Sequence, residues 1–321
     1  MAKSAKYTSD RGKTGSARQL WQQTQKIIKD ANKRSINTRG THLDKLSGFV
    51  NFVGDKFHLQ KIEKIADKHV LAYIEDAYVR GLSSSTIWNT VSAVQYMAKQ
   101  FPEGVSRLSD TSHLKEKYTN QQSTKNENFQ KSDVQRHYIN TGKNPAWTQA
   151  EIDKATQLAL DMKRYDVAIS IQFGIELGTR IHETFRQDRS ALNKALKTGA
   201  LTTKGKGGYI RDIPAQKEAQ REILQLARNQ TSVDHQKAFV PDNKTIKQSM
   251  KSVQNWLYNH RKKFADVPDR KLTYHGLRHA YAQREFERIE KLTGNTRIAL
   301  REVSEQLGHH REWITRVYLS S

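Results

Sequence analysis

Apolar residues recur at helical spacing through most of this chain and alternate over only one short stretch. The helical spacing covers residues 17–101, 149–163, 165–178 and 275–318. By contrast, residues 198–214 (TGALTTKGKGGYIRDIP) alternate loosely around glycines, which predicts a β-hairpin. The pattern therefore predicts a mainly α fold with one small β-hairpin, of the α+β class.

Two changes in pattern divide the chain. Helical spacing stops at Pro102 and Gly104, and a polar stretch follows that is typical of a linker or an extended insertion. Thr148 and Glu151 then form a predicted capping box, in which each side chain accepts a hydrogen bond from a free amide of the next helix. The expected order is a basic disordered arm at 1–16, a helical domain at 17–101, a linker or insertion at 102–145 and a second domain at 146–321.

The charge of the chain predicts a polyanionic partner. Its 321 residues include 55 Lys and Arg against 33 Asp and Glu, a formal net charge of +22. Such an excess favours nucleic acid, because each neutralised phosphate releases counterions, but it does not distinguish DNA from RNA. The absence of cysteine excludes disulfides, thiolate catalysis and cysteine zinc sites. No apolar run has the length of a membrane helix or a secretory signal, so we expect a cytoplasmic protein.

Two basic residues are candidates for phosphate binding. Arg180 follows a mostly apolar run, which predicts that it lies at the end of a buried helix. A buried arginine needs an anionic partner, which is either a phosphodiester or a carboxylate of the protein, Glu183 or Asp188. Lys206 lies in a Lys-Gly-Lys-Gly-Gly sequence at the expected hairpin tip, where glycines let the backbone approach a ligand. An exposed turn without a ligand is the alternative for Lys206.

Three further basic residues share one face of a predicted helix. His275, Arg278 and His279 are spaced at i, i+3 and i+4. The two histidines also have the spacing of metal ligands, which His309 and His310 would complete. However, glycine follows His275, so the HExxH pattern is absent, and no carboxylate has a supporting spacing. We therefore expect neither a metal nor a cofactor.

Tyr318 is the candidate nucleophile. A tyrosine so near the chain end usually packs against its neighbours, and a phenol attacks only after deprotonation or beside positive charge. Arg180, Arg278 and the histidines would supply that charge if the fold gathered them. Cations around one phenol are what an enzyme needs to attack a phosphodiester without a metal.

Taken in order, these motifs resemble those of the tyrosine recombinases, also called phage-type integrases. GTRIHE at Gly178–Glu183 is similar to the first arginine box of that family, and GKGGYIRDIP at Gly205–Pro214 resembles its β-hairpin signature. HGLRH at His275–His279 resembles the second box. Leu307-Gly308-His309 resembles the third, and Tyr318 follows it. The resemblance covers nearly the whole chain beyond the arm.

The resemblance implies both an architecture and a mechanism. Residues 17–101 would be a core-binding domain that closes with the catalytic domain as a C-shaped clamp around DNA. Tyr318 would attack the scissile phosphate and form a 3′-phosphotyrosyl link. The other implied roles are phosphate binding by Arg180, Arg278 and His309, proton donation by Lys206 with Lys204 as its rival, proton transfer by His275, orientation of neighbouring side chains by Glu183, and packing by His279 and His310.

The implied function is site-specific recombination that integrates or excises a mobile element. The implied partners are double-stranded recombination sites at the nucleoid, a homotetramer on two duplexes and a DNA-bending accessory protein. A type IB topoisomerase and a non-catalytic DNA-binding regulator are the alternatives.

Three departures from the family pattern are visible. Leu177-Gly178-Thr179 replaces Thr-Gly-Leu, and only three residues follow the tyrosine, so a C-terminal exchange helix is expected to be absent or replaced. Residues 285–301 contain an expected inserted turn around Gly294, which is similar to integrases of integrative conjugative elements and genomic islands.

Overall fold

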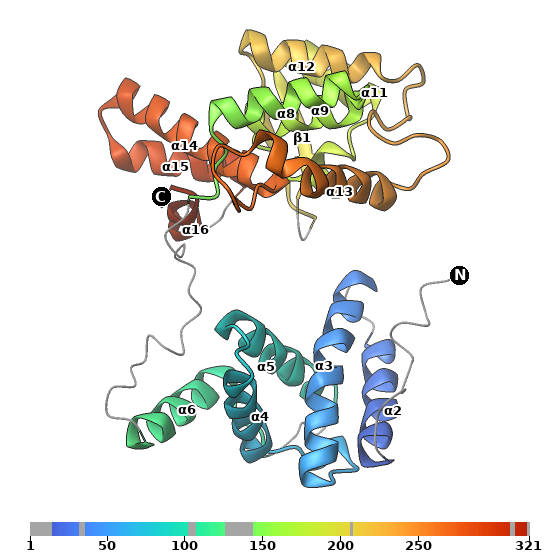
Figure 1. Cartoon of the computed structure of the whole chain (residues 1–321), viewed down its shortest axis with the longest axis vertical. Coiled ribbons are helices and arrows are strands. Elements are labelled where there is room, and N and C mark those ends of the chain that lie inside the picture. Colours follow the sequence, from blue (N-terminus) through green and yellow to red (C-terminus); the bar gives the residue numbers. More distant parts are fainter. Residues whose placement is uncertain are drawn as a thin grey trace. The chain divides into compact units, whose positions relative to one another are not determined.

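The computed structural model of the chain describes residues 15–31, 36–101, 107–125, 144–205, 208–308 and 312–319. The chain divides into two compact units, Met1–His137 and Tyr138–Ser321 (Figure 1), and each unit has its own hydrophobic core. Most of the basic arm expected at 1–16 lies outside the described residues. Its last two residues already belong to the first described helix, which begins at Gly15.

The first unit is a helical bundle. Its elements are α2 (Gly15–Asp30), α3 (Ile36–Phe57), the 3-10 turn η1 (Ile62–Lys64), α4 (Asp67–Val79), α5 (Ser84–Ala98) and α6 (Thr111–Lys125). Helices α2 and α3 approach closely at Gly54, where a Cβ atom would lie 2.5 Å from the Ala17 Cα atom. Ser83 caps α5 by accepting a hydrogen bond from the Thr86 amide, as the run of serines predicts. The helical bundle predicted from the apolar spacing is confirmed.

The stretch 102–145, expected to be a linker or an insertion, contains a helix that the sequence did not predict. Helix α6 lies within this stretch and buries Leu114 in the core of the first unit. Asp67 of α4 accepts hydrogen bonds from the Ser109 amide (2.7 Å) and hydroxyl (2.6 Å), which fixes the chain just before α6. The polar composition of this helix gives almost no amphipathic pattern, so apolar spacing does not predict it.

The second unit is also mainly helical. Its elements are α8 (Gln149–Asp161), α9 (Tyr165–Glu176), α10 (Ile181–Thr184), α11 (Arg189–Thr198), β1 (Ala200–Lys204), β2 (Ile210–Pro214), α12 (Glu218–Asn229), α13 (Ile246–Phe264), α14 (Tyr274–Thr293), α15 (Thr296–Leu307) and α16 (Glu312–Leu319). The predicted capping box is present at the start of α8, where the Glu151 amide donates to Thr148 Oγ1 (3.1 Å) and the Thr148 amide donates to Glu151 Oε2 (3.0 Å). None of the helices in the described part of the chain is long and apolar enough to cross a membrane.

The predicted β-hairpin is present. Strands β1 and β2 pair to form the two-stranded antiparallel sheet found in the described residues. In its register Leu201 faces Ile213 and Thr203 faces Arg211. Alternate residues of β2 are buried, so Arg211 and Ile213 point to the protein interior while their neighbours point to solvent. The hairpin therefore places one arginine in the interior beside an apolar residue.

Helices α14, α15 and α16 share a small apolar cluster that is separate from the main core of the second unit. Helix α14 ends at Gly294, whose φ of +62° lets the chain reverse into α15, and this turn lies where the sequence predicts one. Tyr281, Val303 and Leu307 are buried in the cluster together with Tyr318 of α16. This packing fixes Tyr318 against the first turns of α14.

Candidate active site

The start of α14 holds three of the predicted site residues on one face. Their helical spacing brings His275 and His279 into edge-to-face contact, with ring centroids 5.1 Å apart. The Trp147 indole nitrogen donates a hydrogen bond to the Thr273 carbonyl (2.9 Å), which anchors the chain just before the helix. Gly276 lets this anchor pack closely, because a Cβ atom there would lie 2.4 Å from the Pro145 carbonyl oxygen.

Helix α16 places the Tyr318 side chain on this face. The phenol oxygen is 3.2 Å from His275 Nε2, a hydrogen-bonding distance. The Tyr318 ring stacks on His279, with centroids 4.2 Å apart, and the Arg278 guanidinium carbon lies 5.8 Å from the ring centroid. The Gln283 amide donates to the Tyr318 carbonyl (3.0 Å) and holds the backbone of α16. The fold thus brings the tyrosine and the His-Gly-Leu-Arg-His segment together.

Partial burial and positive charge keep both histidines neutral. Burial, followed by the charges of Arg278 and Arg180, lowers the pKa of His275 to about 4, although part of the residue remains exposed to solvent. Burial also lowers the pKa of His279 to about 4, and the neighbouring His275 adds to this effect. A neutral His275 has one ring nitrogen free to accept a proton.

Arg278 is fully buried beneath Tyr318. Its two terminal nitrogens donate to the backbone carbonyls of Gly178 and Leu307. Burial, then repulsion from Arg180, lowers the pKa of Arg278 to about 10, so the guanidinium stays charged at neutral pH. Gly178 adopts a φ of +59°, and a Cβ atom there would collide with the Tyr281 ring at 2.4 Å. The Leu-Gly-Thr order before Arg180 therefore lets this carbonyl lie beside Arg278.

Arg180 lies beyond the buried helix α9 rather than at its end. The helix ends at Glu176, and Arg180 is the residue that precedes α10. Its guanidinium donates to Glu183 Oε1 (2.9 Å) and its amide donates to Glu183 Oε2 (2.7 Å). Of the two carboxylates predicted as partners, Glu183 is the one that pairs with Arg180, because Asp188 accepts a hydrogen bond from Lys237 (2.7 Å). About a quarter of the Arg180 side chain stays exposed, so it can still meet a ligand.

Glu183 is buried among arginines. The Arg211 guanidinium donates to both of its oxygens, at 2.8 and 2.9 Å. Burial alone would raise the pKa of Glu183, but the hydrogen bonds and charge of Arg211, with the charge of Arg278, lower it to about 2. Glu183 therefore carries a negative charge at every physiological pH. No role was predicted for Arg211 from the sequence, although the inward register that it shares with Ile213 marks it as a buried charge that needs a partner.

Lys206 and His309 lie outside the described residues, as does His310. Their described neighbours lie beside the site. A Cβ atom on Gly205 would lie 3.4 Å from Glu183 Oε1 and 3.7 Å from Arg180 Nη1, and one on Gly308 would lie 2.9 Å from Arg211 Cδ. The rival Lys204 is exposed on β1. Among the described residues, no three His, Asp or Glu side chains are grouped as metal ligands would be.

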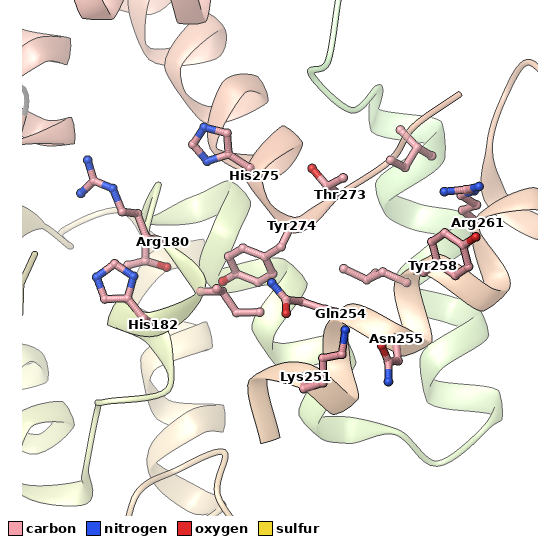
Figure 2. A pocket seen from close by; sticks show the side chains of 14 residues that line it. Arg180, His182, Lys251, Gln254, Asn255, Tyr258, Arg261, Thr273, Tyr274 and His275 are labelled. Atoms are coloured by element: carbon pink, nitrogen blue, oxygen red, sulfur yellow. The ribbon is translucent and has the colours of Figure 1, made fainter. Parts of the chain in front are cut away.

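A pocket of about 520 Å³ extends from Arg180 and His275 along α13. Figure 2 shows Arg180, His182 and His275 on one side, and Tyr258 and Arg261 of α13 on the other. The Arg261 guanidinium lies 4.4 Å from the Tyr258 ring centroid. The remaining labelled side chains include Lys251, Gln254 and Asn255. None of the described residues that line the pocket is acidic, so the pocket suits an anion or a polar ligand.

Comparison with known proteins concerns the fold of the chain. Residues 25–99 match the family described as phage integrase, N-terminal SAM-like domain. The chain is similar to a lambda integrase dimer bound to a COC′ core site, with 14% identity, a TM-score of 0.61 and 94% of each chain covered. It is also similar to a Tn1549 transposon integrase in complex with circular intermediate DNA, with 17% identity, a TM-score of 0.58 and 94% of each chain covered. The chain has the tyrosine recombinase fold.

A third tyrosine recombinase structure, a lambda integrase tetramer bound to a Holliday junction, matches with 16% identity and a TM-score of 0.61. That match covers 98% of this chain and 79% of the lambda chain. No curated protein matches the chain. The first unit thus contains the SAM-like domain of phage integrases, and the second has the fold of an integrase catalytic domain, as the motif order predicts.

Proposed function

We propose that this chain is a site-specific DNA recombinase that cuts and rejoins strands through Tyr318. The observation that carries the proposal is the Tyr318 hydroxyl, 3.2 Å from the Nε2 atom of the neutral His275. A phenol with a neutral imidazole at this distance has a base to take its proton, and positive charge from Arg278 lies beside the ring.

Transesterification proceeds by exchange of one P–O bond for another. The Tyr318 oxygen attacks the phosphorus and its proton passes to His275. The bond from phosphorus to the 5′-oxygen breaks, and Lys206 protonates that oxygen to release a 5′-hydroxyl. The 3′-phosphotyrosyl bond conserves the energy of the phosphodiester, so a 5′-hydroxyl from another strand reverses the reaction without ATP.

The two arginines and His309 bind the non-bridging oxygens of the phosphate. Arg180 is accessible from the pocket, whereas Arg278 has no exposed surface beneath Tyr318. A phosphate therefore reaches Arg278 only after the Tyr318 ring moves aside. Each donor aimed at the developing charge contributes roughly 10²–10³-fold to the rate. Glu183 keeps the Arg180 head in place through its ion pair.

The pocket along α13 is the proposed path of the DNA backbone away from the scissile phosphate. Lys251 and Arg261 supply positive charge along it, while Gln254 and Asn255 supply amide groups that suit hydrogen bonding to DNA. We further infer a homotetramer on two duplexes that integrates or excises a mobile element at the nucleoid, with a DNA-bending accessory protein. The lambda integrase tetramer on a Holliday junction supports that assembly by likeness of fold.

A nicked suicide substrate tests the proposal, because loss of a short 5′ fragment traps the covalent intermediate. Wild-type protein incubated with DNA that carries its recombination site should form a covalent adduct, and Tyr318→Phe should form none. Tyr165→Phe is the matched control, since Tyr165 is half exposed at the start of α9. An adduct with Tyr318→Phe would show that the nucleophile is wrong. Absence of any wild-type adduct would favour a DNA-binding regulator, and relaxation of plasmids without a site would favour a topoisomerase.

A further inference from the structure

Arg211 is a buried cation that the proposed chemistry does not use. It lies on the inward face of β2 with 7% of its surface exposed. A charged side chain is rarely buried unless its donors are satisfied. The hydrogen bonds of the Arg211 guanidinium therefore show which parts of the protein it connects.

Three elements meet at the Arg211 side chain. From β2, its two terminal nitrogens donate to Glu183 of α10, at 2.8 and 2.9 Å. Its Nε atom donates to the Gln306 carbonyl in the last turn of α15 (2.9 Å). A Cβ atom at position 308 would lie only 2.9 Å from the Arg211 Cδ atom, so glycine is the residue that fits there without displacing Arg211. One planar group thus joins the hairpin, the first arginine box and the end of α15.

Each of these elements carries a group assigned to the reaction. Glu183 holds Arg180 by two hydrogen bonds, and the Leu307 carbonyl, next to Gln306, accepts a hydrogen bond from Arg278. Gly205 precedes Lys206 in the chain, and Gly308 precedes His309. Arg211 itself does not line the pocket.

We propose that Arg211 is a positioning residue that keeps the hairpin, the Arg180–Glu183 pair and the end of α15 in the arrangement needed for strand cleavage. This inference rests on the proposed function. Catalytic groups lose rate steeply when they shift, since a misplacement of about 1 Å can cost about 10²-fold. Lysine cannot replace Arg211 fully, because an ammonium group lacks the planar fork that bonds both Glu183 oxygens.

The charge on Glu183 gives this role a measurable signature. Among the described residues, the titratable and charged groups that face Glu183 are Arg180 before α10, His182 within α10, Arg211 on β2, and Tyr274 and Arg278 on α14. Burial raises the pKa of Glu183, and the hydrogen bonds and charge of Arg211 lower it. Loss of Arg211 should therefore raise the pKa of Glu183 from about 2. Protonated Glu183 would no longer hold Arg180 by an ion pair, so cleavage would weaken as the pH falls.

The test measures single-turnover adduct formation on the suicide substrate as a function of pH. Arg211→Gln should lower the rate about 10²-fold with DNA affinity nearly unchanged, and should add an acid limb to the pH profile. Arg211→Lys should be intermediate, and Glu183→Gln/Arg211→Gln should lack the added limb. Arg186→Gln is the matched control, because the exposed Arg186 side chain also donates to the hairpin, at the Lys204 carbonyl (3.3 Å). Its only hydrogen bond with Glu183 in the described structure joins the two backbones, which the substitution leaves in place. Should Arg211→Gln fail to fold, the lysine variant carries the same comparison.

A wild-type rate and pH profile in Arg211→Gln would overturn the inference. Amide hydrogen exchange supplies a readout that needs no activity. The Gly205 amide donates to the Tyr209 carbonyl (2.7 Å) and the Gly308 amide donates to the Glu305 carbonyl (2.9 Å). Both should exchange faster in Arg211→Gln than in wild type, with the interior of α8 unchanged, and equal exchange would overturn the positioning role. Absence of a wild-type adduct would instead refute the proposed function, and the exchange result would still decide the role of Arg211.

Discussion

At the scale of single residues, the active-site hypothesis depends on histidines that stay neutral. His275 and His279 flank the Tyr318 ring, and the pKa of each is lowered to about 4. An imidazolium at His275 would have no lone pair for the tyrosine proton and would add charge beside Arg278. Burial first, and then the charges of the arginines proposed to bind a phosphate, therefore keep His275 unprotonated.

This environment predicts an unusual pH dependence of cleavage. Because the pKa of His275 is lowered from the ordinary 6.5 to about 4, the base stays neutral and active above roughly pH 5. Protonation of His275 should therefore not reduce the rate of adduct formation between about pH 7 and 5. His275→Ala should lower that rate by roughly 10²–10⁴-fold at pH 7. His113→Ala, at an exposed residue of α6, is the control, and a wild-type rate that falls with a midpoint near 6.5 would contradict the assignment.

At the scale of elements, the start of α14 is set by backbone packing. Gly276 leaves room for the chain at Pro145 and Trp147, which crosses the first turn of the helix. A side chain at this position would push the helix away from its anchor and carry His275 and Arg278 with it. The glycine of the His-Gly-Leu-Arg-His segment is thus a packing requirement of the second unit.

Gly276→Ala should accordingly destabilise the second unit. The added Cβ atom would lie 2.4 Å from the Pro145 carbonyl oxygen and 2.7 Å from Trp147 Cδ1, and neither atom belongs to a flexible side chain. Overpacking of this kind costs roughly 1–3 kcal/mol of unfolding free energy. Denaturant unfolding measures the loss, with Gly48→Ala at an exposed position of α3 as the control, where the nearest atom is 3.9 Å away. Equal stability of Gly276→Ala and wild type would show that the chain at Pro145 and Trp147 can move to make room for the added Cβ atom.

At the scale of the whole molecule, the charge and the cores are divided between two units. Each unit buries its own hydrophobic cluster, and the excess of Lys and Arg is shared almost evenly between Met1–His137 and Tyr138–Ser321. A DNA-binding protein built in this way gains phosphate contacts from both units. Its affinity should then depend on salt more steeply than the affinity of either unit alone.

Binding of duplex DNA at several salt concentrations tests this division. The fragment 138–321 should unfold cooperatively by itself, because its core lies within the unit. The logarithm of the DNA-binding constant falls with the logarithm of the salt concentration by about 0.9 for each phosphate that the protein neutralises. For the fragment, this slope should be roughly half the slope of the whole chain. A fragment with the full slope would show that the first unit contributes no phosphate contacts.

The helices and the hairpin of this protein were largely readable from the sequence. Apolar spacing predicted the bundle, α8, α9 and the helices from α14 onward, and glycines marked the hairpin and the turn at Gly294. The short α10 and the helices α11 and α12 were not predicted. Helix α6 was missed because polar residues cover most of its surface, and spacing cannot reveal a helix that buries so little. Periodicity detects an element only when one face is apolar.

The sequence alone determined which chemical groups are available and which residues share a helical face, because both are local properties of the chain. His275, Arg278 and His279 are neighbours on any helix, and a tyrosine, an arginine box and a glycine-rich hairpin can be recognised by their order. Only the tertiary structure decided that Tyr318 stacks on His279, that Glu183 rather than Asp188 holds Arg180, and that Arg211 joins three elements. These contacts link residues far apart in the chain, and a buried charge shows its partner only when the chain has packed around it.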